Sequence, residues 1–282
     1  MSHDFILAGQ WTWNTSLLTG LICIAIVYAL LVKHFTNIKI YYKQPLLFFF
    51  GLGLLYFIMG SPLSSLSHQS FSTHMAQMSI FYFIVPPFLL LGIPNLLFQK
   101  IWETPIAIKI GKLLLPPIIA LSAFAVLFLM YHLPFVLKVL FQHPLFHSGY
   151  TLVLLVLSFR MWWPMIAAPD SSKPIYKEQK KRYAFLSGLI LMPACLLFVV
   201  NGFVGGMNTP FFSSFTTNLP HHSSSSPFNT RFDHFAGGIL MLGIHKFGLM
   251  LTFHIGNKVP DYNSHTMPKK EFKDDDVEEK GG

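Results

Sequence analysis

Seven long apolar segments constrain the fold of this chain more than any other feature. The chain has 282 residues, of which 52% are hydrophobic and only 11% are charged, whereas ordinary soluble domains carry about 25% charged residues. A helix needs about 20 apolar residues to cross the hydrocarbon core of a bilayer. The sequence therefore predicts an all-α, polytopic membrane protein with seven transmembrane helices. The predicted spans are about 15–32, 46–66, 72–93, 113–131, 148–168, 184–203 and 234–256.

The charged residues between the spans predict how the chain lies in the membrane. Segments 33–45, 94–112 and 169–183 and the tail after residue 256 hold 16 of the 20 lysines and arginines. The alternate connections hold only Lys138 and Arg231. Because basic residues are retained on the cytoplasmic side of membranes, we expect the amino terminus outside and the carboxyl terminus in the cytoplasm. The net charge of +8 is thus a topology signal at a lipid bilayer, and no nucleic-acid partner is expected.

The chain is expected to form one membrane domain, residues 1–256, followed by a tail. Residues 257–282 mix lysines with aspartates and glutamates without an apolar period, so we expect a disordered cytoplasmic tail there. The first 14 residues lack the basic region of a cleaved signal peptide, so the first span is expected to be retained. Cys23 and Cys195 lie in separate spans and are interpreted as small core residues. The longest outer connection, 204–233, has no assigned role.

Histidines and methionines gather at the span ends that face outward. The third span opens with His74-Met75-Ala76-Gln77-Met78. Residues three and four apart share one helix face, so this run presents an imidazole and thioethers together. Such donors suit Cu(I), and a site poor in carboxylates disfavours magnesium, calcium and manganese. His74, Met75 and Met78 are therefore candidate copper ligands, with hydrophobic packing as the alternative role of the methionines.

Three further histidines and one aspartate complete the candidate site. His132 ends the fourth span, His147 begins the fifth and His234 begins the seventh; exposed, solvated imidazoles are the alternative. Asp233 is expected to accept a hydrogen bond from a histidine beside the metal, which fixes its tautomer, or to cap its own helix, and the two roles are compatible. The other residues considered are the outer-loop His68 and His143, the cytoplasmic His34, His254 and His265, the interfacial anchor Arg160, and the mid-membrane His245 and Lys246, which receive no role.

Motifs for catalysis are absent from the sequence. The chain holds no P-loop, no G-x-S-x-G and no H-E-x-x-H. Asp233 is almost the only carboxylate near the outer side, and hydrolysis by an acid–base pair needs more titratable partners. We therefore expect a protein that is not an enzyme, and a membrane metalloenzyme is the least favoured alternative.

Several local patterns follow one another in a fixed order. They are Ser61-Pro62-Leu63, His74-Met75-Ala76-Gln77, Pro86-Pro87-Phe88-Leu89-Leu90-Leu91-Gly92-Ile93-Pro94, His132-Leu133-Pro134, the later His147, Trp162-Trp163-Pro164, and Asp233 with Gly237-Gly238. From about residue 45 to 256 this ordered set resembles the CtaG family of Gram-positive bacteria, the assembly factors of the caa3-type cytochrome c oxidase. The chain departs from the family pattern at Met78, where a histidine is common, at His234, where glutamine is expected, and near Tyr150-Thr151, where a Glu-His pair is usual.

The resemblance implies a seven-span protein of the bacterial plasma membrane that helps to build the oxidase, through copper delivery. Cu(I) would be held at the outer boundary and passed to a subunit of the caa3-type oxidase, the ligands being His74 and Met78 with one or more of His132, His147 and His234. Two or three soft ligands allow release, whereas a closed tetrahedral cage retains its metal. Two alternatives stay open: a metal-free membrane scaffold for an oxidase subunit, and a metal or haem transporter, which would need a polar route through the bilayer.

Overall fold

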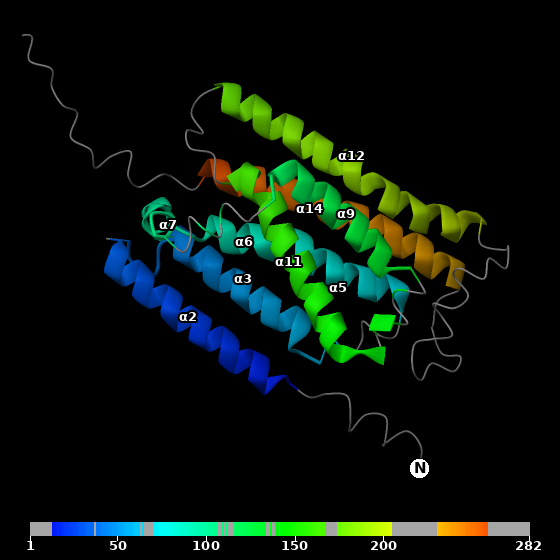
Figure 1. Ribbon diagram of the computed structural model, residues 1–282, viewed down its shortest axis with the longest axis horizontal. Coiled ribbons are helices and arrows are strands. Elements are labelled where there is room, and N and C mark those ends of the chain that lie inside the picture. The colour runs from blue at the N-terminus through cyan, green and yellow to red at the C-terminus, as the bar shows by residue number, and fades with distance from the viewer. Residues whose placement is uncertain are drawn as a thin grey trace, which may run out of the picture.

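The computed structural model is helical throughout the part of the chain that it describes, which confirms the all-α prediction for that part (Figure 1). The described residues are 13–36, 38–62, 64, 70–105, 109, 111, 115–133, 136, 139–140, 142–166, 174–204 and 230–258. The apolar helices are α2 (Thr15–Phe35), α3 (Lys43–Met59), α5 (Phe71–Phe83), α6 (Val85–Leu91), α9 (Pro117–Tyr131), α11 (Pro144–Ile166), α12 (Pro174–Val204) and α14 (Thr230–Lys258). Residues 259–282 of the predicted tail and residues 205–229 of the 204–233 loop lie outside the described residues, whereas residues 257 and 258 belong to α14.

Within the described residues, five helical stretches are long and apolar enough to cross a membrane. They are Thr15–Phe35, Phe71–Leu91, Leu145–Ile166, Glu178–Val200 and Phe232–Gly256. Helices α3 and α9 are also apolar but have 17 and 15 residues. Large apolar side chains remain exposed along the outer faces, for example Ile26 and Leu30 on α2 and Leu152 on α11, as in helices that contact lipid tails. By length and composition the chain is a multi-pass membrane protein.

Two prolines break the third predicted span into α5 and α6. The sequence predicted one membrane span over about 72–93, and within the observed span Phe71–Leu91 the helix is interrupted at Ile84. Pro86 has no N–H to donate to the Tyr82 carbonyl one turn earlier. That carbonyl accepts instead from Ser158 Oγ at 2.5 Å and from Trp162 Nε1 at 3.1 Å. Helix α11 therefore satisfies the backbone where the prolines interrupt the helix.

Helix α3 ends earlier than the predicted second span, which was expected to reach residue 66. The last helical residue is Met59, and Gly60 caps the helix by donating its N–H to the Tyr56 carbonyl at 2.7 Å. Ser61 follows, and because it precedes Pro62 its helical conformation is disfavoured. The connection 94–112, for which no secondary structure was predicted, contains the short helix α7 (Asn95–Trp102), whose Leu97 is buried against α2.

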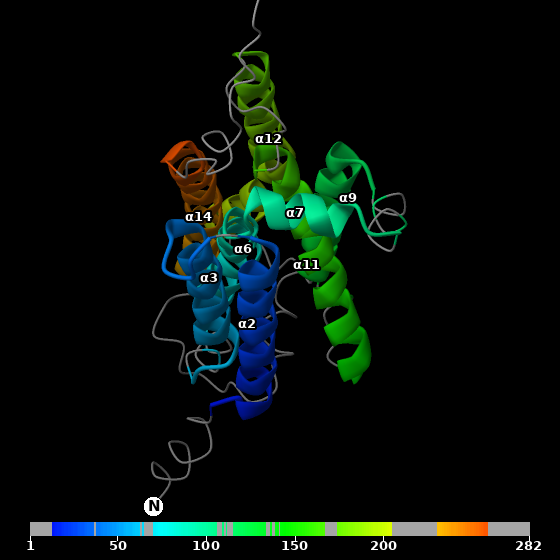
Figure 2. The same ribbon diagram turned by 90° about the vertical axis from the view of Figure 1, so that its left-hand side faces the viewer.

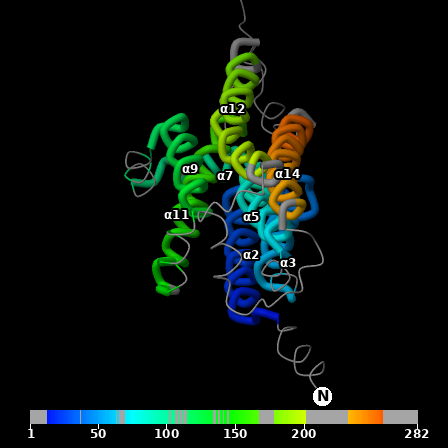
Figure 3. The backbone as a smooth tube through the Cα atoms, turned by 90° about the vertical axis from the view of Figure 1, so that its right-hand side faces the viewer, coloured from blue at the N-terminus to red at the C-terminus, as the bar shows by residue number. Residues whose placement is uncertain are grey.

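Consecutive long helices run in opposite directions. The N–H of Asn14 donates to the Gly60 carbonyl at 2.9 Å, so the start of α2 lies beside the end of α3. Tyr150 of α11 donates to the Leu127 carbonyl of α9 at 2.7 Å, which pairs those helices in the same antiparallel sense. Gly238, near the start of α14, packs against the end of α12. Figure 3 shows α12 and α14 side by side, with α9 and α11 on the other flank.

This alternation separates the histidines and the lysines at opposite ends of the bundle. The starts of α5, α11 and α14 and the end of α9 meet at one end, which carries His74, His132, His147 and His234. The described basic residues at the other end include Lys33, Lys43, Lys100, Lys181 and Lys258. In Figure 2 this second end includes α7 and the ends of α2 and α6. The charge bias read from the sequence thus corresponds to two chemically different ends of the folded chain.

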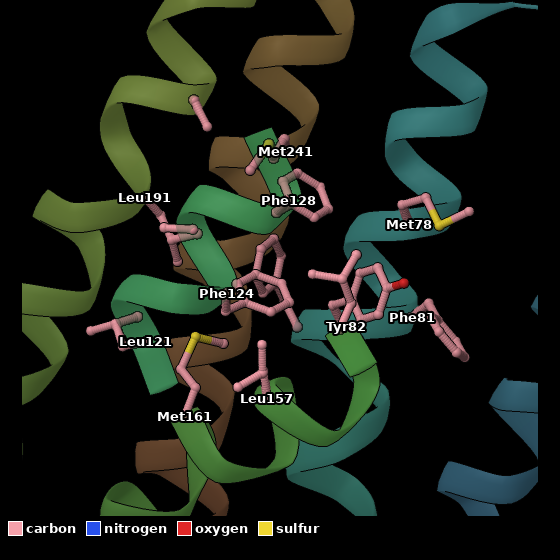
Figure 4. Packing of buried hydrophobic residues seen from close by; sticks show 14 of the residues in the cluster. Met78, Phe81, Tyr82, Leu121, Phe124, Phe128, Leu157, Met161, Leu191 and Met241 are labelled. Atoms are coloured by element: carbon pink, nitrogen blue, oxygen red, sulfur yellow. The ribbon is translucent and has the colours of Figure 1, made fainter. Parts of the chain in front are cut away.

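Aromatic side chains fill the centre of the bundle. Phe124 and Phe128 of α9 are fully buried and stack with ring centres 5.5 Å apart. Tyr82 of α5 and Met241 of α14 reach the same cluster (Figure 4). The core therefore joins α5, α9, α11, α12 and α14, and it lies directly beneath the histidine-bearing end.

Candidate metal centre

His132 presents a buried, unpaired ring nitrogen at the histidine-bearing end. The residue caps the end of α9, where its N–H donates to the Leu129 carbonyl at 3.1 Å. Its Nδ1 lies 2.7 Å from the Phe128 carbonyl. A carbonyl only accepts hydrogen bonds, so Nδ1 carries the proton and the neutral ring keeps a lone pair on Nε2. The side chain is 2% exposed, and Nε2 has no hydrogen-bond partner among the described residues.

This hydrogen-bonding pattern is the one that metal-binding histidines use. A ligating imidazole usually donates its second ring N–H to a carbonyl or carboxylate, which fixes the tautomer and the ring orientation. An unpaired buried acceptor otherwise destabilises the fold by about 1–3 kcal/mol. His132 is therefore arranged to bind an ion or a donor through Nε2.

His74 is the nearest imidazole to His132. The two ring centres lie 6.0 Å apart. With a metal–nitrogen bond of about 2.0 Å, two imidazoles that share one ion place their ring centres roughly 6 Å apart. Met78 lies one turn deeper on the face of α5 that carries His74 and is buried, as Figure 4 shows. Met75 faces the other way, since its Cγ packs beside Gly237 of α14.

Tyr131 connects His147 to this pair. A hydrogen bond of 3.0 Å joins the Tyr131 hydroxyl to His147 Nε2. The Tyr131 ring centre lies 6.2 Å from that of His74 and 5.1 Å from that of His132. Tyr131 was not among the site residues predicted from sequence, although its position immediately before His132 was a signal. His147 is only partly buried, so it forms the more accessible side of the group.

The ring of Phe71 contacts the rings of both His234 and His132. The His234 ring stacks on Phe71 with centres 4.5 Å apart and planes 12° apart. The same phenylalanine lies 6.5 Å from the His132 ring and 5.2 Å from Phe198 of α12. The four candidate histidines are thus held together through aromatic rings. In the part of the chain that the structure covers, no three residues among His, Cys, Asp and Glu are arranged to hold one ion.

Asp233 caps a helix, but it is not the helix that contains it. Its Oδ2 accepts the Phe71 N–H at 2.7 Å, and its Oδ1 accepts the N–H and the hydroxyl of Ser72 at 3.0 and 2.5 Å. These groups form the N-terminus of α5. Asp233 therefore caps α5 across 162 residues of sequence and joins α14 to the helix that carries His74, whereas the sequence predicted a cap of its own helix as the alternative. All of these contacts go to α5 rather than to a histidine, so the expected tautomer-fixing contact is not formed.

The remaining histidines of the described residues lie away from this group. His143 is exposed and contacts the ring of Phe146. His34 and His254 are exposed at the lysine-bearing end. His245 is buried in the interior of the bundle. His68 and His265 are outside the described residues.

Comparison with known proteins gives a family for this fold and site. Residues 26–255 match the family described as cytochrome c oxidase caa3 assembly factor (Caa3_CtaG). The chain belongs to this family. The match extends from α2 to α14 and includes every residue of the histidine-bearing group. It confirms the resemblance inferred from the ordered motifs. No curated protein and no solved structure matches the chain.

Proposed function

We propose that this CtaG-family protein carries Cu(I) as a cargo at the outer end of its bundle during assembly of a caa3-type cytochrome c oxidase. His132 and His74 are the primary ligands, and Met78 is the thioether that completes the set. The protein lies in the bacterial plasma membrane with seven spans, its amino terminus outside and its carboxyl terminus in the cytoplasm. The partner is an oxidase subunit that receives the copper, and the protein performs no catalysis.

The single observation that carries this proposal is the state of His132. Its Nδ1–H is tied to the Phe128 carbonyl, and its Nε2 is buried, unpaired and close to a second imidazole. Two-coordinate binding by imidazoles suits Cu(I), which tolerates low coordination and soft or nitrogen donors. The surroundings favour the same ion, because Asp233, the carboxylate that the described residues place near this group, accepts hydrogen bonds from α5.

The arrangement also supports release of the cargo. Among the described residues, His74 and His132 are the imidazoles close enough to share an ion, and a site with two or three ligands holds copper less firmly than a closed cage. His147 is partly exposed and bonded to Tyr131, which itself contacts both His74 and His132. We propose that His147 provides the first imidazole that a departing or arriving Cu(I) meets. Positive charge at the opposite end of the bundle supports an exit on the outer side.

Copper content of purified variants tests the proposal. The full chain is purified in detergent, loaded anaerobically with Cu(I) and challenged with a Cu(I) chelator, and retained copper is measured by mass spectrometry. His132→Ala and His74→Ala are each expected to lower the retained copper by at least tenfold at a chelator concentration that the parent withstands. His143→Ala, an exposed histidine of the same end, is the matched control and is expected to behave as the parent.

The rival function is a metal-free scaffold that binds an oxidase subunit. It predicts that His132→Ala and the parent retain the same amount of copper, or that neither retains any, while both still bind the subunit. Either result would refute the copper-carrying proposal and leave family membership intact. Assembly of active oxidase in cells that carry each variant then shows whether the scaffold alone is sufficient.

A further inference from the structure

His245 is a second buried imidazole that the outer group does not use. It lies near the middle of α14, is 2% exposed, and its Nε2 has no hydrogen-bond partner among the described residues. Its ring contacts Phe83 at 5.0 Å and Trp162 at 6.2 Å between centres. A polar atom buried in this way destabilises the fold unless it binds a ligand or accepts a hydrogen bond from another donor.

The polar environment of His245 comes from the break between α5 and α6. Pro87 has no N–H to donate to the Phe83 carbonyl one turn earlier. Gly248 of α14 packs directly against that carbonyl, because a Cβ built on this glycine would lie 2.6 Å from the oxygen. Discontinuous membrane helices commonly form ion sites at their broken ends, because carbonyls are freed there. His245 is thus placed beside the one helix break that the described spans contain.

A soft donor lies one turn above His245 on the same helix. Met241 precedes His245 by four residues, so both side chains share one face of α14, and Met241 is fully buried. Helices α5 and α14 run parallel, since Phe71 stacks on His234 and Phe83 contacts His245. This register places Ser79 at the level of Met241.

Ser79 adds a second unpaired polar group to this part of the bundle. The residue is fully buried, and its Oγ has no hydrogen-bond partner in the described part of the chain. The level of α14 from Met241 to His245 therefore combines a thioether, an imidazole and a hydroxyl at the α5–α14 interface. Such a combination in the interior of a membrane protein marks a functional site more often than a packing accident.

The chemistry of these donors selects a soft, monovalent ion. The acidic residues of the described part, Glu103, Glu178 and Asp233, are exposed or engaged elsewhere, so a hard divalent cation lacks its preferred oxygen ligands. Imidazole with thioether suits Cu(I). The rings of Phe83 and Trp162 add faces that attract a cation. The neighbouring Lys246 is exposed and extends its Nζ to Gly188 of α12, away from this face.

We propose that His245 and Met241 form a second Cu(I) site inside the bundle, distinct from the outer pair. His245 follows His234 by eleven positions, which correspond to about 16 Å along α14. Met75 and Met78 of α5 lie between the two levels and belong to the same buried cluster as Met241. The inner site holds copper within reach of the outer site, which deepens the proposed function. The inner site rests on the proposed function for the identity of the metal, but it is formed by different residues.

Copper stoichiometry separates the two sites. The full chain in detergent is loaded anaerobically with Cu(I), passed through a desalting column and analysed for copper per chain. The parent is expected to hold two, the His74→Ala/His132→Ala variant one, the His245→Ala variant one, and the combined variant none. His254→Ala, which removes an exposed imidazole of the same helix, is the matched control and is expected to hold two.

Met241→Leu supplies a second measurement that does not depend on loss of an imidazole. This exchange conserves volume and is tolerated in packed cores. X-ray absorption at the copper edge, measured on the His74→Ala/His132→Ala background, is expected to show a sulfur neighbour that disappears in Met241→Leu. Circular dichroism and thermal unfolding of each variant report whether the fold is retained.

Each outcome decides between the sites. One copper per chain in the parent, lost on changing His74 and His132 and unaffected by His245→Ala, would overturn the inner site and leave the outer one. One copper lost only on changing His245 would support the inner site and overturn the proposed role of the outer pair. A parent that holds no copper contradicts both. A sulfur neighbour that persists in Met241→Leu contradicts the assignment of Met241.

Discussion

Replacement of Asp233 by alanine is expected to loosen the start of α5 and with it the helix that carries His74. The carboxylate is 6% exposed and accepts two backbone N–H groups of α5, those of Phe71 and Ser72. Ser70 Oγ accepts the third, from Thr73, at 3.2 Å. The first turn of a helix has no intrahelical acceptors for these groups, so one side chain from α14 satisfies most of what this helix end requires.

The size of the effect follows from the burial of the two donors. Phe71 is buried, so its N–H loses its acceptor with no water to replace it, which costs about 1–3 kcal/mol. Ser72 is partly exposed, and water compensates for much of its loss. A carboxylate at a partly buried helix N-terminus contributes up to about 2 kcal/mol through the helix dipole. The sum predicts that Asp233→Ala lowers the local stability of the start of α5 by about 2–4 kcal/mol.

Hydrogen exchange at the start of α5 is the most direct assay. Local stability lower by 2–4 kcal/mol accelerates exchange of the amides in peptides covering residues 70–74 by roughly 30- to 1,000-fold. Glu178→Ala removes an exposed carboxylate and is expected to leave this exchange unchanged, since such surface changes stay within about 0.5 kcal/mol. Equal exchange in Asp233→Ala and Glu178→Ala would refute the assignment of Asp233 as the cap of α5.

Two further predictions concern close helix contacts. Gly248→Ala places a Cβ 2.6 Å from the Phe83 carbonyl oxygen and is expected to destabilise the protein by about 1–3 kcal/mol. Gly243→Ala on the same helix meets nothing within 4 Å and is expected to be neutral or to stabilise by up to about 1 kcal/mol; equal thermal midpoints in detergent would contradict this contrast. Tyr28→Phe removes the 2.6 Å hydrogen bond to the Gly92 carbonyl and is expected to lower the free energy of unfolding by about 1 kcal/mol, and an unchanged denaturant midpoint would disprove it.

The sequence predicted which histidines belong to the candidate site but not which of them contact one another. His74 and His132 were identified because each was predicted to lie at the outer end of an apolar segment. Their pairing depends on the antiparallel contact between α5 and α9, which leaves no local pattern in sequence. The signal for Tyr131 was its position beside His132, but its hydrogen bond to His147 requires α11 to pack against α9. Contacts of this kind have no sequence periodicity.

The helix break illustrates the same division. The sequence contained the cause, because Pro86 and Pro87 cannot donate backbone hydrogen bonds. It did not show which groups replace the missing donor, because the Tyr82 carbonyl accepts hydrogen bonds from Ser158 and Trp162, which are 76 and 80 residues away. The position of the prolines in the sequence predicts where the helix is interrupted. Only the packed structure shows whether the carbonyls left without a donor there bond to a neighbouring helix or remain available to a ligand.

The amino-acid sequence by itself determined the class of the protein and the different chemistry of the two ends of its helical bundle. Apolar length requires helices in a bilayer because backbone groups have no other partners there, and the lysine bias gives each end a different chemistry. Tertiary structure alone decided which of the histidines meet, that Asp233 holds the start of α5, and that His132 and His245 each keep a buried ring nitrogen unpaired. The physical reason is that apolar periodicity selects the buried face of each helix, whereas the partner of a buried polar group is chosen by helices that are distant in sequence.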